Sequence, residues 1–127
     1  MGIETSGEYG GADASFTSVI IAVEELAKID PSVSALCNIH NTLVNSTFRK
    51  YGTKGQQDKW LPPLATEKLG SFCLSESASG SDAFALQTKA EKDRNYWIIN
   101  GSKTYALGPF ISTPPIIRRP QMDYERL

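Results

Sequence analysis

The first half of the chain repeats apolar residues at the three- and four-residue spacing of amphipathic helices. Between residues 14 and 29 this spacing predicts one helix, and Asp13 is placed to cap its first turn. A second helix is expected to begin at Pro31, since proline fits the first turn of a helix. Gly52 follows the last periodic residues and is expected to end that helix.

A third, shorter helix is predicted after Gly52. Thr53 and Gln56 have the spacing of a capping box, in which each side chain bonds the other residue's backbone N–H. Proline lacks the N–H that a helix interior needs, so the pair Pro62-Pro63 is expected to stop the helix near Leu61.

From about residue 70 the pattern changes to that of strands. Residues 70–74 predict a buried strand, and residues 86–92 alternate apolar or small residues with polar ones. Residues 93–95 are expected to turn the chain into a strand over 96–99, and Asn100-Gly101 is typical of a tight hairpin turn. The chain is therefore predicted to be α+β, with helices first and antiparallel strands after.

The end of the chain shows no periodicity of either kind. Four of the seven prolines lie in the final 19 residues, and residues 106–127 are predicted to be a disordered, proline-rich tail. The expected divisions are a partial helical domain over 1–67, a partial β domain over 68–105, and this tail. A sheet with uncovered edges is an aggregation hazard, so the pattern predicts an incomplete molecule.

Composition narrows the functional classes. The 127 residues amount to about one domain. Thirteen basic and fourteen acidic residues give a net charge of -1, which argues against a nucleic-acid binder. Two cysteines make neither a disulfide framework nor a zinc site, so no metal is expected. No apolar run has the length of a membrane span, and the first residues are unlike a signal or transit peptide.

The densest group of candidate functional residues is FCLSESASGSD, residues 72–82. Small and hydroxyl residues after a strand let backbone amides approach a phosphate or a planar cofactor closely. The same composition is also typical of a serine-rich surface turn, and the pattern alone leaves both interpretations open. The segment is neither a Walker loop nor a Gly-x-Gly-x-x-Gly dinucleotide loop.

This segment resembles the flavin loop of the acyl-CoA dehydrogenase family. Within that family, the sequence most resembles the short/branched-chain type. Four flanking segments agree with the family in order and spacing over roughly residues 8–105: EYGGADASF, VEELAKIDPSVSALCNIHNTLVN, YGTKGQQDKWLPPLATEKLGSF and TKAEKDRNYWIINGSKTY. The resemblance implies a helical N-terminal domain, a middle antiparallel β-barrel and a C-terminal helical bundle. The chain would hold the later N-terminal helices and the first barrel strands.

The resemblance also assigns cofactor-binding residues. Ser75 would offer its hydroxyl and the neighbouring amides to the flavin ring, and Ser81 would lie where FAD and the CoA part of the substrate meet. Tyr105 would stand in place of a flavin-stacking tryptophan. Ala78 replaces a usual glycine, and would be strained if that position needs a positive φ. The residues that would line FAD are Phe72, Cys73, Leu74, Ser75, Glu76, Ser77, Ala78, Ser79, Gly80 and Ser81.

The implied activity is FAD-dependent oxidation of a short or branched acyl-CoA to the 2,3-enoyl-CoA. The family's catalytic base is a glutamate of the C-terminal bundle, and Glu76 matches a loop acid instead, so the chain alone is expected to be inactive. The resemblance further implies an electron-transfer flavoprotein as partner, a homotetramer and the mitochondrial matrix. Two alternatives stay open: a non-catalytic interaction fragment and a fragment of an acyl-CoA oxidase.

The remaining distinctive residues have plain structural interpretations. His40 lies on an apolar helix face, without partners at metal-ligand spacing, and is expected to be a packed histidine. Cys37 and Cys73 are expected to be small buried residues. Trp60 and Trp97 are expected to anchor the core.

Overall fold

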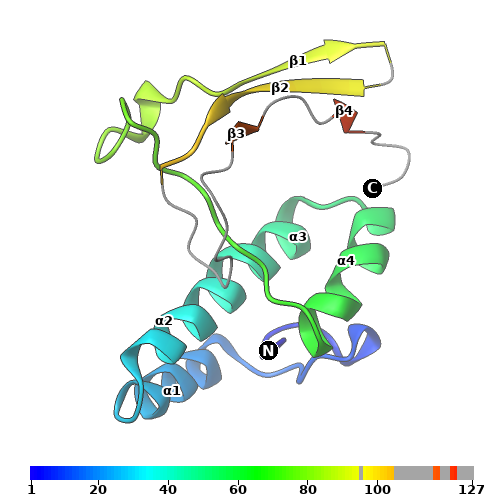
Figure 1. Ribbon diagram of the computed structural model, residues 1–127. Helices are drawn as coiled ribbons and strands as arrows, with labels where there is room; N and C mark the ends of the chain where they lie inside the picture. Colours follow the sequence, from blue (N-terminus) through cyan, green and yellow to red (C-terminus); the bar gives the residue numbers. More distant parts are fainter. Residues whose placement is uncertain (95, 105–115, 118–120, 123–127) are drawn as a thin grey trace. The chain divides into compact units, whose positions relative to one another are not determined.

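The computed structural model describes residues 1–94, 96–104, 116–117 and 121–122 (Figure 1). These residues form two compact units. Residues 1–72 make a helical unit, and the described residues from 73 onward make a unit that holds the strands. The predicted α+β class, with helices first and antiparallel strands after, is confirmed.

The helical unit contains the three helices that the sequence predicts, with changed ends. The second begins at Pro31 as expected and ends before Gly52, and the third begins with the expected capping box of Thr53 and Gln56. α1 and α2 lie side by side, and α2, η2 and α3 follow one another without a break (Figure 1). The segments are a 3-10 helix η1 (Gly7–Tyr9), α1 (Phe16–Ala27), α2 (Pro31–Ile39), a π-helix η2 (His40–Asn45), α3 (Ser46–Tyr51) and α4 (Lys54–Thr66).

The cap of α1 is Ser15, so the assignment of this role to Asp13 is wrong. Ser15 Oγ accepts the backbone N–H of Ser18 at 3.4 Å. Asp13 has a φ of 51°, in the left-handed region, and its backbone N–H donates to Thr5 O at 3.0 Å. The turn at Asp13 therefore holds the N-terminal loop, and the helix starts two residues later than the earliest apolar position suggests.

The π-helical turn η2 was not predicted, and polar side chains explain it. Thr42 Oγ1 donates to Asn38 O at 2.8 Å, and Asn41 Nδ2 donates to Cys37 O at 2.9 Å. Side chains that bond the carbonyls of the preceding turn compete with the α-helical hydrogen bonds. The other end of the Asn41 amide accepts the backbone N–H of Ile3 at 2.9 Å, so the turn also ties down the N-terminal segment.

α4 continues through Pro62 and Pro63, so the prediction that this pair stops the helix near Leu61 is wrong. The fixed φ of proline suits a helix. Each ring removes one N–H donor and crowds the carbonyl four residues earlier, which belongs to Asp58 or Lys59. Both of those residues are exposed, so water can satisfy their carbonyl groups.

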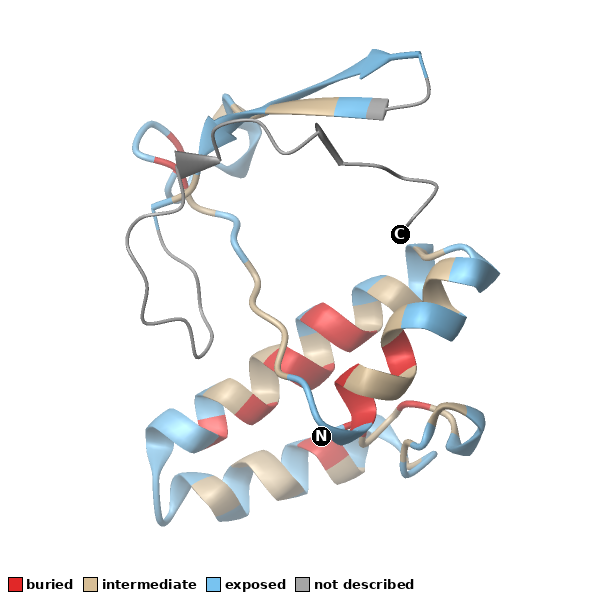
Figure 2. Cartoon of the chain, turned by 45° about the vertical axis from the view of Figure 1, so that its right-hand side comes forward, coloured by how far each residue is buried: buried red, intermediate tan, exposed pale blue. Residues whose placement is uncertain are grey.

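The core of the helical unit is formed by small and medium side chains on the sides of the helices that face one another (Figure 2). Trp60 is half-buried and lies against Phe48, with 6.4 Å between the ring centroids. The buried apolar residues are Val19, Cys37, Val44, Leu61, Leu64 and Ala65. Large apolar side chains are exposed on the helices of this unit and in the turn after α1: Phe16, Ile20, Ile21, Ile29, Val33 and Leu43.

In the second unit, β2 pairs antiparallel with β1, β3 and β4. Lys89 pairs with Asn100 and Asp93 with Tyr96, which fixes the register of β1 on β2. Arg94 makes the turn between them with a φ of 54°. The elements are a 3-10 helix η3 (Ala83–Ala85), β1 (Lys89–Asp93), β2 (Tyr96–Ser102), β3 (Ile116–Ile117) and β4 (Gln121–Met122).

Four predictions about the second half of the chain are wrong. Residues 70–74 form no strand, and Cys73 is exposed rather than buried. Asn100-Gly101 makes no hairpin turn, because β2 runs straight through it. A Cβ on Gly101 would lie 2.7 Å from the Cα of Thr88, so this glycine permits close approach of two backbones. Trp97 is 38% exposed and does not anchor a core among the described residues.

The predicted tail is described only in part. Within residues 106–127 the short strands β3 and β4 pair with β2. The other residues of the tail lie outside the described residues, as does Tyr105. The prediction of disorder there stays a prediction.

Truncation of Leu61 should destabilise the helical unit. Its side chain is 1% exposed, so Leu61→Ala removes buried methyl groups and leaves a cavity. We expect a loss of about 2–5 kcal/mol in the free energy of unfolding, measured by urea denaturation. Ile29→Ala is the control, since Ile29 is 89% exposed and its loss should cost less than about 0.5 kcal/mol. Equal losses in the two variants would contradict this core.

Candidate functional site

The loop singled out in the sequence begins with a tight turn. Glu76 N–H donates to Ser79 O and Ser79 N–H donates to Glu76 O, both at 3.0 Å. These reciprocal bonds place Ser77 and Ala78 at the exposed tip of the turn. Neither Ala78 nor Gly80 has a positive φ, so alanine at position 78 is not strained in this conformation.

The Glu76 carboxylate organises the segment around this turn. Glu76 is 7% exposed, and its oxygens accept the backbone N–H groups of Gln87 at 2.6 Å and Thr88 at 3.2 Å. Lys103 Nζ donates to the same carboxylate at 2.7 Å. The carboxylate therefore joins the loop to the residues before β1 and to the end of β2.

These contacts stabilise the ionised form of Glu76. The Lys103 ammonium, followed by hydrogen bonds from Thr88 and Gln87, lowers the pKa of Glu76 to about 2. A carboxylate with so low a proton affinity is poorly suited to be a general base, which works best with a pKa near the operating pH.

Two further bonds hold the chain just before the turn. Lys103 Nζ also donates to Leu74 O at 3.0 Å, and the backbone N–H of Thr104 donates to Ser75 O at 2.8 Å. The backbone over Leu74–Glu76 is thus held against residues that follow β2 directly. Lys103 directly follows β2, and no local sequence pattern indicated its role.

The structure separates the predicted site residues by exposure. Ser79 is buried, and its hydroxyl donates to Asp82 O at 2.6 Å, so this hydroxyl is engaged inside the loop. Asp82 in turn accepts the N–H of Phe84 and caps η3. Phe72 and Ser75 are half-buried, and the exposed members are Cys73, Leu74, Ser77, Ala78, Gly80 and Ser81.

The exposed part of this loop fits a polar, planar cofactor. Ser77 and Ser81 present hydroxyls, Leu74 presents an apolar side chain, and the small residues Ala78 and Gly80 leave the backbone accessible. Hydroxyls and backbone amides are donors that a flavin or a phosphate accepts. These groups lie in and directly beside the turn closed by Glu76 and Ser79, and Tyr105 lies outside the described residues.

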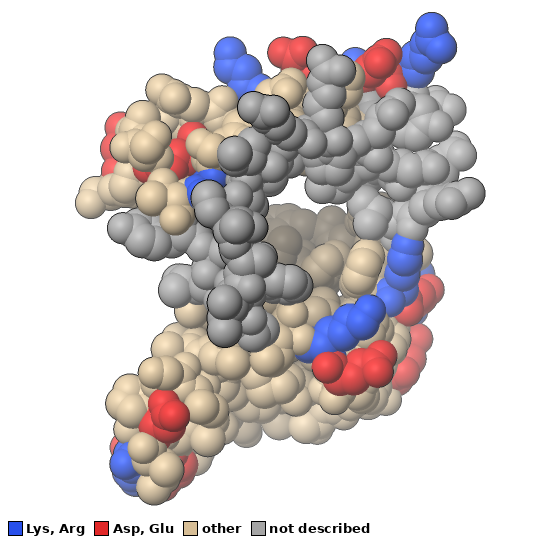
Figure 3. Space-filling model, in the orientation of Figure 1, with Lys and Arg blue, Asp and Glu red and all other residues tan. Residues whose placement is uncertain are grey.

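Other parts of the molecule offer less chemistry. In the described ranges, no three His, Cys, Asp or Glu side chains are placed to hold a metal ion. None of the helices in those ranges is long and apolar enough to cross a membrane. Acidic and basic side chains intermix on the face drawn in Figure 3. In the helical unit, Lys54 forms ion pairs with Glu8 and Asp58, both at 3.0 Å.

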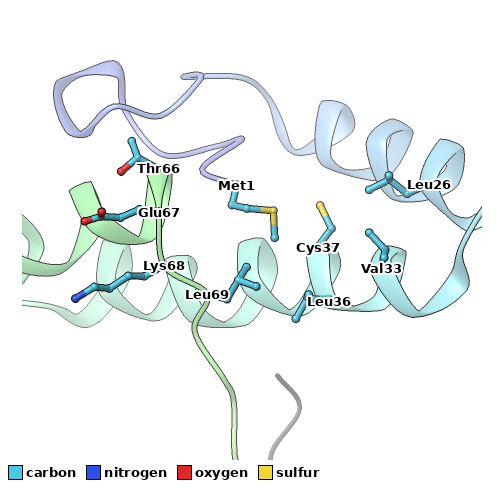
Figure 4. Close-up of a pocket in the computed structure, with 9 residues that line it drawn as sticks. All are labelled: Met1, Leu26, Val33, Leu36, Cys37, Thr66, Glu67, Lys68 and Leu69. Atoms are coloured by element: carbon cyan, nitrogen blue, oxygen red, sulfur yellow. The ribbon is translucent and has the colours of Figure 1, made fainter. Parts of the chain in front are cut away.

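One apolar pocket lies within the helical unit. Its volume is about 430 Å³, and Figure 4 shows Met1 extending between the two helices α1 and α2 and the segment after α4. Most of its lining is apolar, with side chains such as Leu26, Val33 and Leu69, and Thr66, Glu67 and Lys68 complete it. The pocket is therefore suited mainly to apolar contacts.

Comparison with known proteins places these features in a family. The family model "Acyl-CoA dehydrogenase, N-terminal domain" matches residues 1–68. The chain is 57% identical, over 105 residues, to the mitochondrial short/branched chain specific acyl-CoA dehydrogenase of Rattus norvegicus. The match covers 83% of this chain and 24% of the rat protein, so the chain spans about a quarter of the length of its curated relatives.

Solved structures agree with this match. A glutaryl-CoA dehydrogenase from Mycobacterium smegmatis in complex with FADH2 has a TM-score of 0.78 and 31% identity, covering 84% of this chain and 28% of that one. A chain from the electron transferring flavoprotein structure of Acidaminococcus fermentans has a TM-score of 0.79 and 37% identity, covering 83% of this chain and 28% of that one.

The stability of the strand-bearing unit should depend on the ionisation of Glu76. Because folding lowers its pKa from 4.5 to about 2, the unfolded chain takes up a proton in this range and the folded chain does not. The free energy of unfolding should therefore fall as the pH falls from about 4.5 to about 2. Urea denaturation followed by Trp97 fluorescence, in a Trp60→Phe background, measures this slope.

Glu76→Gln should flatten the slope, since the variant carries no titrating carboxylate at this position. The matched control is Glu91→Gln, because Glu91 is an exposed acid on β1. The control should keep the wild-type slope. If Glu76→Gln keeps it as well, the assigned role of Glu76 is wrong.

Proposed function

The chain belongs to the acyl-CoA dehydrogenase family, and we propose that it is part of an FAD-dependent enzyme that oxidises short or 2-methyl-branched acyl-CoA. The product of that reaction is the 2,3-enoyl-CoA. The observation that carries the proposal is the identity of 57% to a short/branched chain specific enzyme over most of this chain. The ordered turn at Glu76, with its exposed small and hydroxyl residues, supports it from the structure.

The proposed task of these residues is to bind and orient FAD, which supplies the hydride acceptor of the reaction when bound. Ser75 offers its hydroxyl and the adjacent amides to the flavin ring, and Ser81 contacts both cofactor and substrate. Glu76 and Lys103 keep the backbone of the loop in place. The base that removes the substrate α-proton is a carboxylate outside these 127 residues.

The proposed domain organisation follows the family. Residues 1–67 form part of the N-terminal helical domain, and residues 68–105 form the opening of the middle β domain. The family model over residues 1–68 supports the first division. Residues 106–127 are a divergent tail, and Tyr105 takes the place of the aromatic residue that stacks on the flavin.

The proposed partners and compartment also come from the relatives. The rat and bovine proteins are named mitochondrial, which supports the mitochondrial matrix. The similarity to a chain from an electron transferring flavoprotein structure supports such a flavoprotein as the electron acceptor. A homotetramer is proposed for the intact protein by resemblance alone.

A second candidate function is a non-catalytic chain that pairs with intact subunits of the same family. The observation that favours it is the set of exposed large apolar side chains on α1 and α2, together with the apolar pocket beside them. A chain of this kind self-associates in isolation. A monodisperse monomer with one sharp cooperative melting transition would contradict this alternative.

Binding of FAD tests the proposed role of the loop. We expect the purified chain to bind FAD saturably, seen as a change in the visible flavin spectrum and in flavin fluorescence. Ser75→Ala removes one hydrogen bond and should weaken the affinity by up to about tenfold. Ser102→Ala, an exposed serine on β2, is the control and should leave the affinity unchanged.

Two outcomes would contradict the assignment. A wild-type chain that leaves the flavin spectrum unchanged at high FAD concentration would show that the loop is no independent cofactor site. Equal affinities in the Ser75→Ala and Ser102→Ala variants would remove Ser75 from the proposed contacts.

Turnover tests the proposed absence of the base from this chain. Loaded with FAD and mixed anaerobically with butyryl-CoA or 2-methylbutyryl-CoA, the chain should leave the flavin absorbance unbleached. An enzyme that lacks its general base loses on the order of a hundredfold to ten-thousandfold in rate. Stoichiometric bleaching by either thioester would place a working base within residues 1–127.

A further inference from the structure

His40 is a buried histidine that the proposed chemistry does not use. It is 0% exposed and stands at the first position of the π-helical turn η2. Its Nδ1 accepts the backbone N–H of Gly70 at 3.0 Å, and its Nε2 lies 2.8 Å from Leu64 O. A backbone N–H can only donate, so Nδ1 carries no proton and Nε2–H donates to the carbonyl. One neutral ring thus joins the last turn of α4 to Gly70.

Gly70 is held from a second side by Val44, which is buried on the same turn η2. A Cβ at position 70 would lie 3.2 Å from both Cβ and Cγ2 of Val44, and closer still to Cγ1. A larger residue at position 70 would therefore collide with Val44, so this position favours glycine. The π-helical turn carries both His40 and Val44, so it presents the hydrogen bond and the packing contact to the same residue.

Other donors than His40 satisfy the carbonyl groups of Pro62 and Pro63 near the end of α4. The carbonyl of Pro63 accepts the N–H groups of Glu67 at 3.0 Å and Lys68 at 2.7 Å, and Thr66 Oγ1 donates to Pro62 O at 2.9 Å. A side chain that merely completed this helix end would need only a donor. The acceptor of the ring, Nδ1, binds the backbone N–H of Gly70, which lies between α4 and the end of the helical unit.

We propose that His40 is a positioning residue for the loop over 72–81, acting through Gly70. The ring and Val44 hold the backbone at Gly70, two residues ahead of Phe72. The inference rests on the proposed cofactor role of that loop, and it adds a residue 32 positions upstream of the loop's first member. Burial of the ring, which lowers the pKa of His40 below 6.5, keeps Nδ1 available as an acceptor.

The first test uses the unmodified chain. Nitrogen-15 NMR should show His40 in the tautomer with a proton on Nε2 only, and the Gly70 amide should exchange slowly with solvent. A proton on Nδ1, or a Gly70 amide that exchanges at the rate of an unstructured peptide, would overturn the proposal. Neither measurement depends on FAD.

The second test compares three variants by amide exchange and FAD affinity. His40→Gln replaces the ring by a carboxamide, whose acceptor and donor also flank a single carbon, and should keep both readouts near wild type. His40→Leu fills the space without hydrogen bonds, and should lose the protection of Gly70 and weaken FAD binding by about five- to tenfold. Asn41→Leu is the matched control, an equally buried polar residue that contacts Ile3 and Cys37 instead.

The outcomes separate this proposal from the proposed function. Loss of Gly70 protection in His40→Leu but not in Asn41→Leu, with rescue by His40→Gln, supports the positioning role. Equal effects of His40→Leu and Asn41→Leu on Gly70 protection and FAD affinity would overturn the proposal, because His40 would then act only as a buried core residue. If His40→Leu does not fold, Gly70→Ala disturbs the same contact from the side of Gly70. It should likewise lose the protection of the amide at position 70 and weaken FAD binding. A wild-type chain that protects Gly70 yet binds no FAD would contradict the proposed function alone.

Discussion

The part of the molecule that bears the strands depends on a buried carboxylate. Glu76 is the point where the loop, the residues before β1 and the end of β2 meet, because its oxygens accept from Gln87, Thr88 and Lys103. A buried carboxylate without partners would be costly, whereas one with several donors fixes the conformation of each donor's segment. The hydrogen bonds of Glu76 therefore hold the turn that carries the exposed residues Ser77 and Ala78.

The helical unit uses a neutral polar group in a comparable way. His40 joins Leu64 to Gly70, and Asn41, its neighbour on the π-helical turn, joins Cys37 to Ile3. Buried polar side chains with complete partners specify one arrangement, since any other arrangement leaves a donor or acceptor unpaired. Such contacts explain how a small, incompletely covered apolar core holds its loops in defined positions.

Local signals made much of this fold predictable from sequence. The capping box of Thr53 and Gln56 acts within four residues, so the sequence alone located the start of α4. The pair Pro62-Pro63 led to a wrong end for α4. The free-energy cost of proline in a helix depends on whether distant side chains or water reach the carbonyls that it leaves unpaired. Glu76 and Lys103 lie 27 residues apart, and only the strand register brings them together. The site residues were named by family resemblance, whereas the contacts that hold them required the structure.

The hydrogen bonds of Glu76 and Ser75 should hold this loop in its conformation before any cofactor binds. Hydrogen exchange of the backbone amides of Gln87, Thr88 and Thr104 in the FAD-free chain tests it most directly, because these amides donate to Glu76 and Ser75. We expect slow exchange at all three amides, and accelerated exchange at Gln87 and Thr88 in Glu76→Gln. Exchange at the rates of an unstructured peptide, slowed only when FAD is added, would contradict it.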